Sequence, residues 1–335
     1  MSVKEKNATK KSIAAGQYDI IVGTHAILQK NVEFYNLALC ICDEQHRFGV
    51  AQRSSLLSKG NSPDLLVMSA TPIPRTLSLI FYGDLDITTI TDKPKARAVV
   101  GTNIVPQVKY DGMYKFISNE IQKGNKIYFV APKIEDDPEG EIMSVTRLYE
   151  QLIERLPQTK IALLHGKMKD DEKREIMHCF KNGDCNVLVS TTVIEVGIDV
   201  PNATVMVICD ADRFGLSQLH QLRGRVGRSD LQSYCFLLTS TDNPDSMERL
   251  KTLCASSDGF KIAEADFKMR GGGDILGTRQ SGRQSSFLGA LKYSPQALFL
   301  AKKISDDCFE RNLFDDELRR EAMKKYDDLC NISLN

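Results

Sequence analysis

The chain has 335 residues, 42% of them hydrophobic, and its 44 lysines and arginines are balanced by 44 aspartates and glutamates. A chain of this length and composition is expected to form two globular domains or slightly more, each with its own core. The formal net charge of zero excludes a globally basic nucleic-acid-binding protein, so any surface for nucleic acid has to be local.

The first part of the chain alternates short apolar runs with helical stretches, a pattern typical of βα units and a parallel sheet. Its predicted strands are residues 19–23, 37–42 and 64–70, and we assign residues 1–92 to a first α/β lobe. Between about residues 91 and 103 the composition turns to Asp, Lys, Pro, Arg and Gly. Residues 93–104 are therefore predicted to be a connector.

A second α/β lobe is predicted for residues 105–245. Its strands are expected at residues 126–131, 160–164, 186–190, 203–209 and 233–239. A helix between two of them should begin at the acidic residues 170–172, which favour its amino-terminal dipole, and end at Asn182-Gly183. Residues 246–335 are predicted to be helical, interrupted by a glycine-rich loop from Arg270 to Gly282.

Nine cysteines are scattered along the chain without a Cys-x-x-Cys pair. We therefore expect buried free thiols in a reducing cytoplasm, and neither a metal cluster nor a disulfide framework. Apolar runs such as residues 203–209 are too short to span a membrane, and MSVKEKNATKK at the amino terminus lacks the apolar core of a signal peptide. The chain is predicted to be cytoplasmic, without a membrane partner.

Two carboxylates follow the second predicted strand, in the stretch LALCICDEQHRFGV. In open α/β sheets, ligands bind at the carboxyl ends of the strands. Asp43 can hold Mg²⁺, usually through water, and Glu44 can orient and deprotonate the water that attacks a γ-phosphate. A plain polar junction between strand and loop is the alternative.

Hydroxyl residues follow the third predicted strand. Ser69 and Thr71 can bond to His46 or Asp43, which would pass the state of a nucleotide to a second surface. The alternative is that Thr71 caps a helix at residues 76–82. Both interpretations hold together if Thr71 caps and Ser69 couples.

Three arginines stand close together in QLHQLRGRVGR, at Arg223, Arg225 and Arg228. A guanidinium is suited to a planar clamp on phosphate oxygens. An ordinary solvated helix face is disfavoured, because Gly224 and Gly227 would each cost about 1 kcal/mol relative to alanine in a helix interior.

Loops after two other predicted strands offer donors to a nucleic-acid backbone. In the loop after residue 190, Thr191 and Thr192 hydroxyls and the amides around Gly197 can hold DNA phosphates, and Asp199 can bond a nucleotide sugar. Thr24 and His25 follow the first predicted strand, where a simple turn is the alternative.

Six segments occur in one order: GTHAIL, DEQHRFGV, SATPIPRTL, LLHGKM, STTVIEVGIDVP and QLHQLRGRVGR. Together they resemble the later motifs of superfamily 2 DNA helicases, closest to the RecG family of branched-DNA translocases. The tail from Asp258 to Gly282 is similar to the translocation hairpin that RecG shares with transcription-repair coupling factors. The chain departs from the family pattern at DEQH, where DEEH is usual, and at Gly272, where RGPG has proline.

The resemblance covers essentially the whole chain and implies two RecA-like lobes, ATP and Mg²⁺ as cofactors, and branched or forked DNA as the partner. It implies that Asp43 serves Mg²⁺ and that Glu44 is the general base. Gln221, Arg225 and Arg228 would reach the γ-phosphate, and His46, Gly197 and Asp199 are further nucleotide-site candidates. Residues implied to contact or move DNA are Thr24, His25, Ser69, Thr71, Thr191, Thr192, Arg270, Arg279 and Gln280.

The chain contains no G-x-x-x-x-G-K-[ST] loop for nucleotide phosphates, since its one Gly-Lys pair, Gly166-Lys167, is followed by methionine. We therefore expect an incomplete first lobe, an upstream phosphate loop and wedge domain missing from this chain, and negligible ATPase activity from the chain alone. Residues 1–90 should be less stable than the second lobe, because an incomplete sheet exposes a strand edge and apolar surface. The alternatives are an ATPase-dead fragment that only binds nucleic acid and a translocase like the transcription-repair coupling factor.

Overall fold

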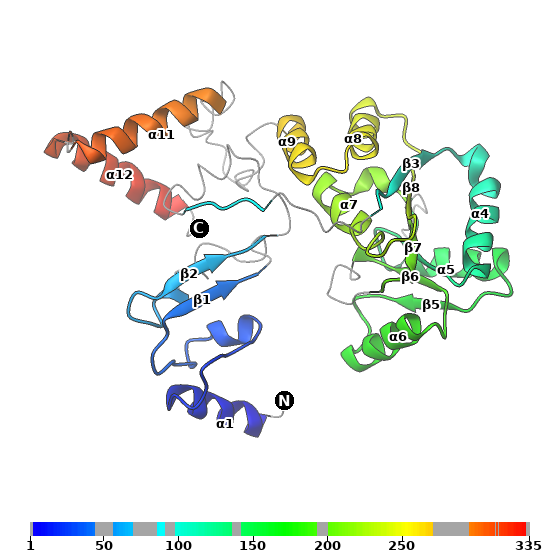
Figure 1. Ribbon diagram of the computed structural model, residues 1–335, viewed down its shortest axis with the longest axis horizontal. Helices are drawn as coiled ribbons and strands as arrows, with labels where there is room; N and C mark the ends of the chain where they lie inside the picture. Colours follow the sequence, from blue (N-terminus) through cyan, green and yellow to red (C-terminus); the bar gives the residue numbers. More distant parts are fainter. Residues whose placement is uncertain are drawn as a thin grey trace. The chain divides into compact units, whose positions relative to one another are not determined.

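The computed structural model describes residues 3–43, 56–69, 86–90, 98–135, 142–192, 200–270, 295–311, 313 and 315–332 (Figure 1). The chain divides into two compact units, Met1–Pro72 and Ile73–Asn335. We call these the first unit and the second unit.

A pair of parallel strands forms the described sheet of the first unit. β1 (Leu39–Cys42) and β2 (Asp64–Val67) follow α1 (Val3–Ala14) and the 3-10 helix η1 (His25–Leu28). The strands predicted at residues 37–42 and 64–70 are therefore confirmed, with shorter bounds.

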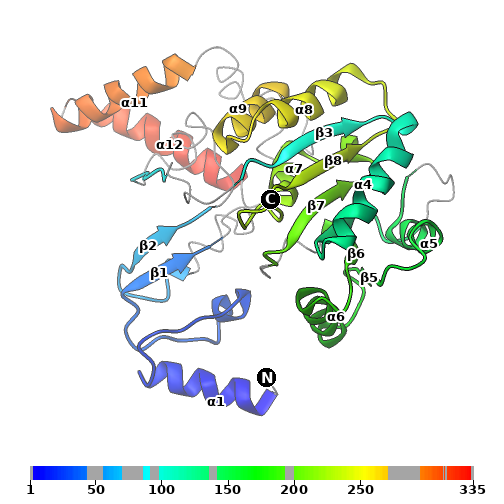
Figure 2. The same ribbon diagram turned by 45° about the vertical axis from the view of Figure 1, so that its right-hand side comes forward.

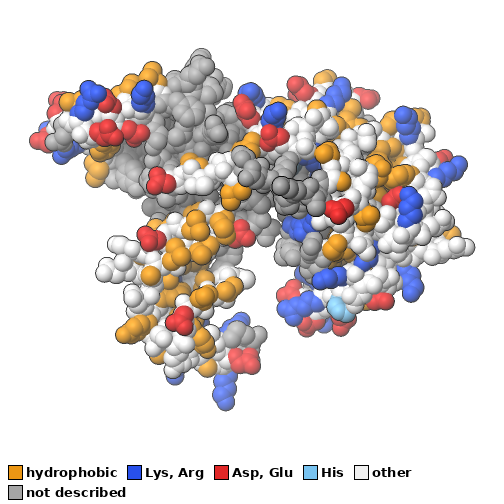
Figure 3. Space-filling view, in the orientation of Figure 1, with side chains coloured by type: hydrophobic (Ala, Val, Ile, Leu, Met, Phe, Trp, Pro, Cys, Tyr) orange, Lys and Arg blue, Asp and Glu red, His pale blue; other side chains and the backbone are white. Residues whose placement is uncertain are grey.

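The two faces of this small sheet differ in burial. Cys40 and Cys42 point to one face, where they are buried against Leu56. The other face carries large apolar side chains that are 42–58% exposed, namely Leu39, Ile41, Leu66 and Met68. Hydrophobic side chains gather over these strands in Figure 3. We call these four residues the apolar face of the first unit.

The strand predicted at residues 19–23 is absent, so that prediction was wrong. These residues are described as an irregular segment, with Ile20 82% and Val22 93% exposed. A strand exists only through pairing with a neighbour, and the described part of the first unit places none beside this segment. The apolar pattern of residues 19–23 suits a strand, but the prediction also required a neighbouring strand to pair with it.

Six parallel strands form the sheet of the second unit, in the order β3-β8-β7-β4-β6-β5. The sequence predicts five of them. The sixth, β3, falls mostly within the residues assigned to the connector, and it pairs with β8. The strand bounds are β3 (Gly101–Val105), β4 (Lys126–Val130), β5 (Ile161–Leu164), β6 (Val187–Ser190), β7 (Ala203–Ile208) and β8 (Tyr234–Leu238).

Helices cover both faces of this sheet, which is why its central strands are buried throughout. Alternate residues of β4 point to opposite cores: Phe129 packs with α4 and α5, and Tyr128 with α6 and α7. Figure 2 shows α4 on the near side of the sheet and α7 on the far side. The helix bounds are α4 (Tyr110–Gln122), α5 (Val145–Arg155), α6 (Asp170–Asn182), α7 (Leu216–Arg223), α8 (Pro244–Ala255) and α9 (Gly259–Arg270). The α/β class with parallel sheets is thus confirmed.

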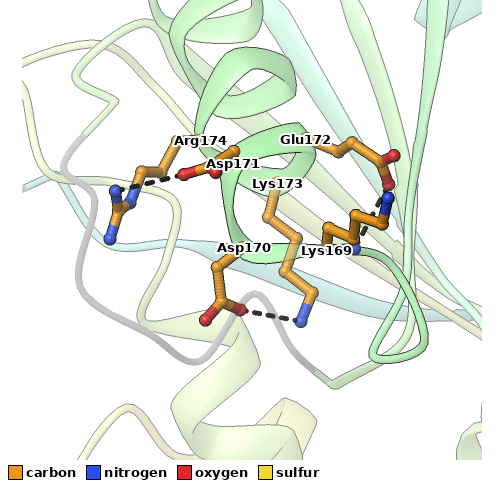
Figure 4. A network of polar contacts seen from close by, with 6 residues as sticks. All are labelled: Lys169, Asp170, Asp171, Glu172, Lys173 and Arg174. Carbon is orange, nitrogen blue, oxygen red and sulfur yellow. Dashed lines mark hydrogen bonds and ion pairs between the residues drawn. The ribbon is translucent and has the colours of Figure 1, made fainter. Parts of the chain in front are cut away.

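The predicted helix at residues 170–182 is α6. Its acidic first turn lies at the positive end of the helix dipole, and the Glu172 carboxylate accepts a 3.2 Å hydrogen bond from the Lys169 amide (Figure 4). Ion pairs join Lys173 to Asp170 and Arg174 to Asp171, both at 3.4 Å. Gly183 ends the helix in the left-handed conformation, with φ of 93°.

Two further helices follow, α11 (Pro295–Glu310) and α12 (Asp316–Ile332), so the predicted helical tail is confirmed for the described residues. Short 3-10 helices precede α4 and α7, namely η3 (Gln107–Lys109) and η5 (Ala211–Arg213). Among the described residues, no helix has both the length and the apolar character needed to cross a bilayer.

Candidate nucleotide and nucleic-acid site

The carboxyl end of the sheet in the first unit carries two of the predicted site residues. Asp43 directly follows β1, and Ser69 lies two residues beyond β2. The Met68 amide donates a 2.7 Å hydrogen bond to the Cys42 carbonyl, so the strand pairing continues to this edge. Asp43 and Ser69 are both exposed and occupy the same edge, where ligands bind in open α/β sheets.

Thr24 and His25 lie at the start of η1 rather than at the end of a strand. Thr24 is the N-cap residue, and its backbone carbonyl accepts a 3.1 Å hydrogen bond from the Ile27 amide. The turn that we considered as an alternative is therefore present. The Thr24 side chain is exposed and makes no cap hydrogen bond, so it faces solvent at this turn.

Four polar residues mark the carboxyl ends of adjacent strands in the second unit. Because β7, β4, β6 and β5 are neighbours in that order, the residues that follow them line one edge of the sheet. These residues are Asp210, Lys133, Thr191 and His165. No role was predicted from the sequence for Asp210, Lys133 or His165. Their position just beyond an apolar strand is the signal that identifies them.

Two buried polar atoms at this edge have no hydrogen-bond partner among the described residues: the Ser190 hydroxyl and Nδ1 of His165. A buried polar group left unsatisfied costs about 1–3 kcal/mol, so such atoms normally meet water or a ligand. Thr191 is only 7% exposed, and Thr192 is half-buried. Of the two predicted phosphate contacts, Thr192 is therefore the more accessible.

A lysine just beyond β5 adds positive charge to this part of the edge. Lys167 Nζ lies 2.6 Å from Glu135 Oε1, and both side chains are largely exposed. The hydrogen bond from Lys167, together with its charge, lowers the pKa of the Glu135 carboxyl. Because a phosphate can compete with an exposed carboxylate, this ion pair is compatible with binding of a nucleic-acid backbone.

The motif QLHQLRGRVGR forms α7 and the loop after it, residues 224–228, which we call the arginine loop. Gln221 is half-buried on α7. The Arg225 amide donates to the Leu222 carbonyl at 3.0 Å, and Arg228 Nε donates to the Gly224 carbonyl at 3.3 Å. The loop thus folds back on the end of the helix and presents two half-buried guanidinium groups, a suitable arrangement for an anion.

Arg223 does not belong to this pair, so its assignment to a phosphate clamp was wrong. Its side chain is 5% exposed, and Nη1 donates to the carbonyls of Leu253 and Ser256 at 2.7 and 2.8 Å. Burial lowers the pKa of its guanidinium. Neighbouring positions in the sequence suggested a shared role. The end of α7 separates Arg223, which faces the core, from Arg225 and Arg228 in the arginine loop.

Gly227 has a conformational and a steric reason to be glycine. Its φ is 72°, and a Cβ there would lie 2.7 Å from Cγ2 of Val100. Only glycine adopts such a backbone without strain and permits this close approach. The glycines of the motif thus lie at and beyond the end of α7 rather than in its interior.

Several predicted site residues lie outside the described residues and stay predictions: Glu44, His46, Thr71, Gly197, Asp199, Arg279 and Gln280. Arg270 is the last residue of α9.

The carboxylate that follows β1 is a suitable ligand for Mg²⁺. Asp43 offers an exposed carboxylate at the strand end, the hard oxygen ligand that this ion prefers. No group of three or more His, Cys, Asp or Glu side chains in the described ranges is arranged to hold a metal. A magnesium ion held by one or two carboxylates, water and nucleotide phosphates needs no such cage, so the residues fit this ion.

Comparison with known sequences first defines the class. Residues 1–80 match the profile of DEAD/DEAH box helicases, and residues 108–230 match the helicase conserved C-terminal domain. Together with the parallel sheets and the arginine motif, these matches place the chain among the superfamily 2 helicases.

Closer relatives then give the family. Residues 256–313 match the profile of ATP-dependent DNA helicase RecG, domain 3, C-terminal. The chain is 48% identical to RecG of Thermotoga maritima over 279 residues, covering 83% of this chain and 36% of the relative. It is 46% identical to RecG of Aquifex aeolicus over 344 residues, covering 99% and 43%. The chain belongs to the RecG family.

A solved structure agrees with this assignment. The structure of RecG bound to a three-way DNA junction is 43% identical, with a TM-score of 0.66, and covers 87% of this chain and 38% of that one. The chain therefore spans about two fifths of the length of the relatives that it matches.

Proposed function

We propose that this chain is the motor portion of an ATP-dependent DNA helicase that acts on branched DNA in the cytoplasm, in repair and recombination. The observation that carries the proposal is its 43% identity to a RecG structure whose ligand is a three-way junction. Fork reversal and branch migration of Holliday junctions are the reactions that such a motor would drive.

In the proposed nucleotide site, Asp43 binds Mg²⁺ and Glu44 accepts a proton from the attacking water. When bound, the ion would neutralise phosphate charge. Gln221, Arg225 and Arg228 approach the γ-phosphate, and the half-buried arginines stabilise its developing charge. His46, Gly197 and Asp199 complete the proposed nucleotide contacts. The arginine loop supports this assignment, since the Arg225 backbone is bonded to the end of α7 and the Arg228 guanidinium is held by its bond to the Gly224 carbonyl.

The proposed DNA contacts use the start of η1 in the first unit and the end of β6 in the second. Thr24 and His25 belong to the first unit, and Thr191 and Thr192 to the second. The unsatisfied Ser190 hydroxyl beside Thr191 supports a polar ligand at this edge. Ser69 and Thr71 are proposed to couple nucleotide state to DNA binding, and Arg270, Arg279 and Gln280 to couple it to DNA movement. This division corresponds to a first lobe within residues 1–92, a second lobe that begins with β3 at Gly101 and extends to residue 245, and a coupling segment at 246–335.

A second candidate is an ATPase-dead module that only binds nucleic acid. It is favoured by the absence of a G-x-x-x-x-G-K-[ST] loop from all 335 residues. Positioning of the phosphates supplies much of phosphoryl-transfer catalysis, so we expect negligible hydrolysis by this chain alone.

One measurement separates these candidates: ATP hydrolysis with and without a three-way DNA junction. It compares this chain alone with a fusion in which the Thermotoga maritima relative supplies the sequence upstream of its match. Junction-stimulated hydrolysis by the fusion alone supports the motor proposal. Hydrolysis by neither protein, together with junction binding by this chain, supports the binding module. Hydrolysis by this chain alone contradicts the requirement for a phosphate loop.

A further inference from the structure

The buried guanidinium of Arg223 joins two segments that match different profiles. Arg223 ends α7 and lies within residues 108–230, which match the general helicase domain. Ser256, whose carbonyl it contacts, is the first residue of the segment that matches the RecG-specific profile, residues 256–313. The contact links residues 33 positions apart. It therefore crosses from the shared helicase domain to the part that distinguishes this family.

We call the contacts of Arg223 with Leu253 and Ser256 the joint. Three features make this joint stiff. Leu253 lies in the last turn of α8, and Ser256 is its C-cap, so Arg223 supplies donors to carbonyls that the helix itself leaves unsatisfied. A cation at this end also interacts favourably with the helix dipole. Nη2 lies 2.9 Å from Nδ1 of His220, one turn back on α7. Breaking such bonds in a buried site leaves polar groups without solvent, which makes the joint resist distortion.

The joint continues into α9 through a short chain of hydrogen bonds. The Ser256 hydroxyl accepts from the Asp258 amide at 3.1 Å, and the Asp258 carboxylate accepts from the Phe260 amide at 2.9 Å. Asp258 thereby caps the start of α9. We call Ser256, Asp258 and Phe260 the α8–α9 corner.

A second contact joins α7 directly to α9. The Ser217 hydroxyl, on the first turn of α7, donates to the Asp266 carboxylate near the end of α9 at 3.3 Å. Between these two contacts, Leu219, Leu222 and Ile262 share one buried core. α7 thus contacts the corner that precedes α9 through Arg223, and it contacts α9 itself through Ser217. Because the two helices also share a core between these contacts, displacement of one is expected to displace the other.

We propose that Arg223 is a positioning residue that transmits movement of the arginine loop to the α8–α9 corner and so to the RecG-specific segment. The loop begins at the next residue, so any nucleotide-driven shift of Arg225 or Arg228 pulls directly on the end of α7. This inference rests on the proposed function, because ATP-dependent movement of those arginines is the signal transmitted.

The test compares two substitutions of Arg223 with a matched control. Arg223→Met keeps the length of the side chain and removes its donors, while Arg223→Lys keeps the charge and loses the planar group that reaches His220 and the carbonyls together. Lys126→Met is the control, since the buried Lys126 ammonium also donates to a carbonyl across elements, that of Lys181 on α6 at 2.5 Å, but away from α8 and the corner.

The functional readout is the number of junctions unwound per ATP hydrolysed, in the protein at the length that its source cell expresses. We expect Arg223→Met to lower this ratio at least tenfold while ATP hydrolysis falls less than threefold, with Arg223→Lys intermediate and Lys126→Met unchanged. A loss of hydrolysis and unwinding in equal proportion would overturn the inference, because a merely structural or nucleotide-site role predicts that result.

A second pair of variants covers the case in which Arg223→Met does not fold. Asp258→Ala removes the cap of α9 without touching Arg223, and Asp258→Asn retains an acceptor there. Uncoupling by the first and not by the second supports transmission through the corner. Normal coupling in both contradicts it.

Hydrogen exchange of this 335-residue chain separates failure of the inference from failure of the proposed function. Faster exchange at residues 258–262 in Arg223→Met, with β4 and β7 unchanged, is expected whether or not the chain hydrolyses ATP. Unchanged exchange at the corner overturns the inference by itself. A wild-type protein without junction-stimulated hydrolysis would contradict the proposed function. The hydrogen-exchange result would still test whether Arg223 holds the α8–α9 corner.

Discussion

Ile41 and Leu66 lie directly opposite each other in the parallel pair of β1 and β2, and both are about half exposed, at 58% and 48%. Parallel sheets are normally covered on both faces, so two large apolar side chains in register on an uncovered face are unusual. They form the centre of the apolar face. We expect such a surface to favour self-association.

Substitutions on the apolar face should therefore reduce non-specific binding without unfolding the first unit. We expect Ile41→Thr together with Leu66→Thr to lower the fluorescence of the dye ANS and the tendency to aggregate, while the free energy of unfolding changes by no more than about 1 kcal/mol. Leu65→Thr is the matched control, because Leu65 packs on the opposite, buried face. That variant should unfold more readily and bind more dye. Equal dye binding by the double variant and the wild type would contradict the role of this face.

Two glycines with positive φ test the packing of the arginine loop. A Cβ at Gly183 (φ 93°) meets no atom within 4 Å, whereas at Gly227 (φ 72°) it meets Val100. We expect Gly183→Ala to cost about 1 kcal/mol in free energy of unfolding, from backbone strain alone. Gly227→Ala should cost roughly 1–3 kcal/mol more, because the loop or Val100 must shift.

Urea unfolding of both variants measures this difference. Val100→Ala in the Gly227→Ala background should recover part of the loss, since it removes the methyl group that the new Cβ meets. Equal destabilisation by the two glycine substitutions would show that the close approach is unimportant.

Buried thiols in the second unit should make its stability depend on alkaline pH. Burial raises the pKa of Cys185 to about 11 and that of Cys209 and Cys235 to about 12. Between an ordinary thiol pKa and these values, the unfolded chain has lost protons that the native chain still holds. The thiols' contribution to stability is therefore complete at neutral pH and is lost as the pH rises.

Urea unfolding at pH 7.5 and pH 10, under reducing conditions, measures this loss. We expect a smaller loss between the two pH values in Cys209→Ala than in the wild type. Cys179→Ala is the control, because Cys179 is exposed and its removal should leave the pH dependence unchanged. A Cys209→Ala variant with the full wild-type loss would rule out the thiol contribution.

Patterns within one segment allowed most elements to be predicted, while relations between segments did not follow from them. The helix α6 was predicted from its acidic start and terminal glycine, which are local signals. β3 was not predicted, because its residues are only partly buried and its pairing with β8 joins positions far apart in the chain. Residues 19–23 show the converse, since their pattern suits a strand but no described neighbour completes it.

The candidate site shows the same division. The arginine motif and the strand-end residues Asp43 and Thr191 were identified from local sequence. The buried role of Arg223 required the carbonyls of α8, which lie 30 and 33 residues further along the chain. Residue type alone therefore indicated anion binding for all three arginines, whereas burial shows that Arg223 has a different role.

The assignments of Glu44 and Arg228 predict different defects in a protein competent for ATP hydrolysis. Glu44→Gln keeps the size of the side chain and removes the base, so we expect hydrolysis to be abolished while nucleotide binding is retained. Arg228→Ala removes a guanidinium that acts on developing charge, which should lower hydrolysis about 10³-fold or more and weaken ground-state binding far less.

Single-turnover hydrolysis and equilibrium binding of a fluorescent ATP analogue measure the effects of the two substitutions separately. Arg213→Ala, an exposed arginine of η5 outside the motif, is the control and should leave hydrolysis unchanged. Normal hydrolysis by Glu44→Gln would exclude Glu44 as the base, and loss of binding equal to the loss of rate in Arg228→Ala would indicate that this arginine holds the ground state instead.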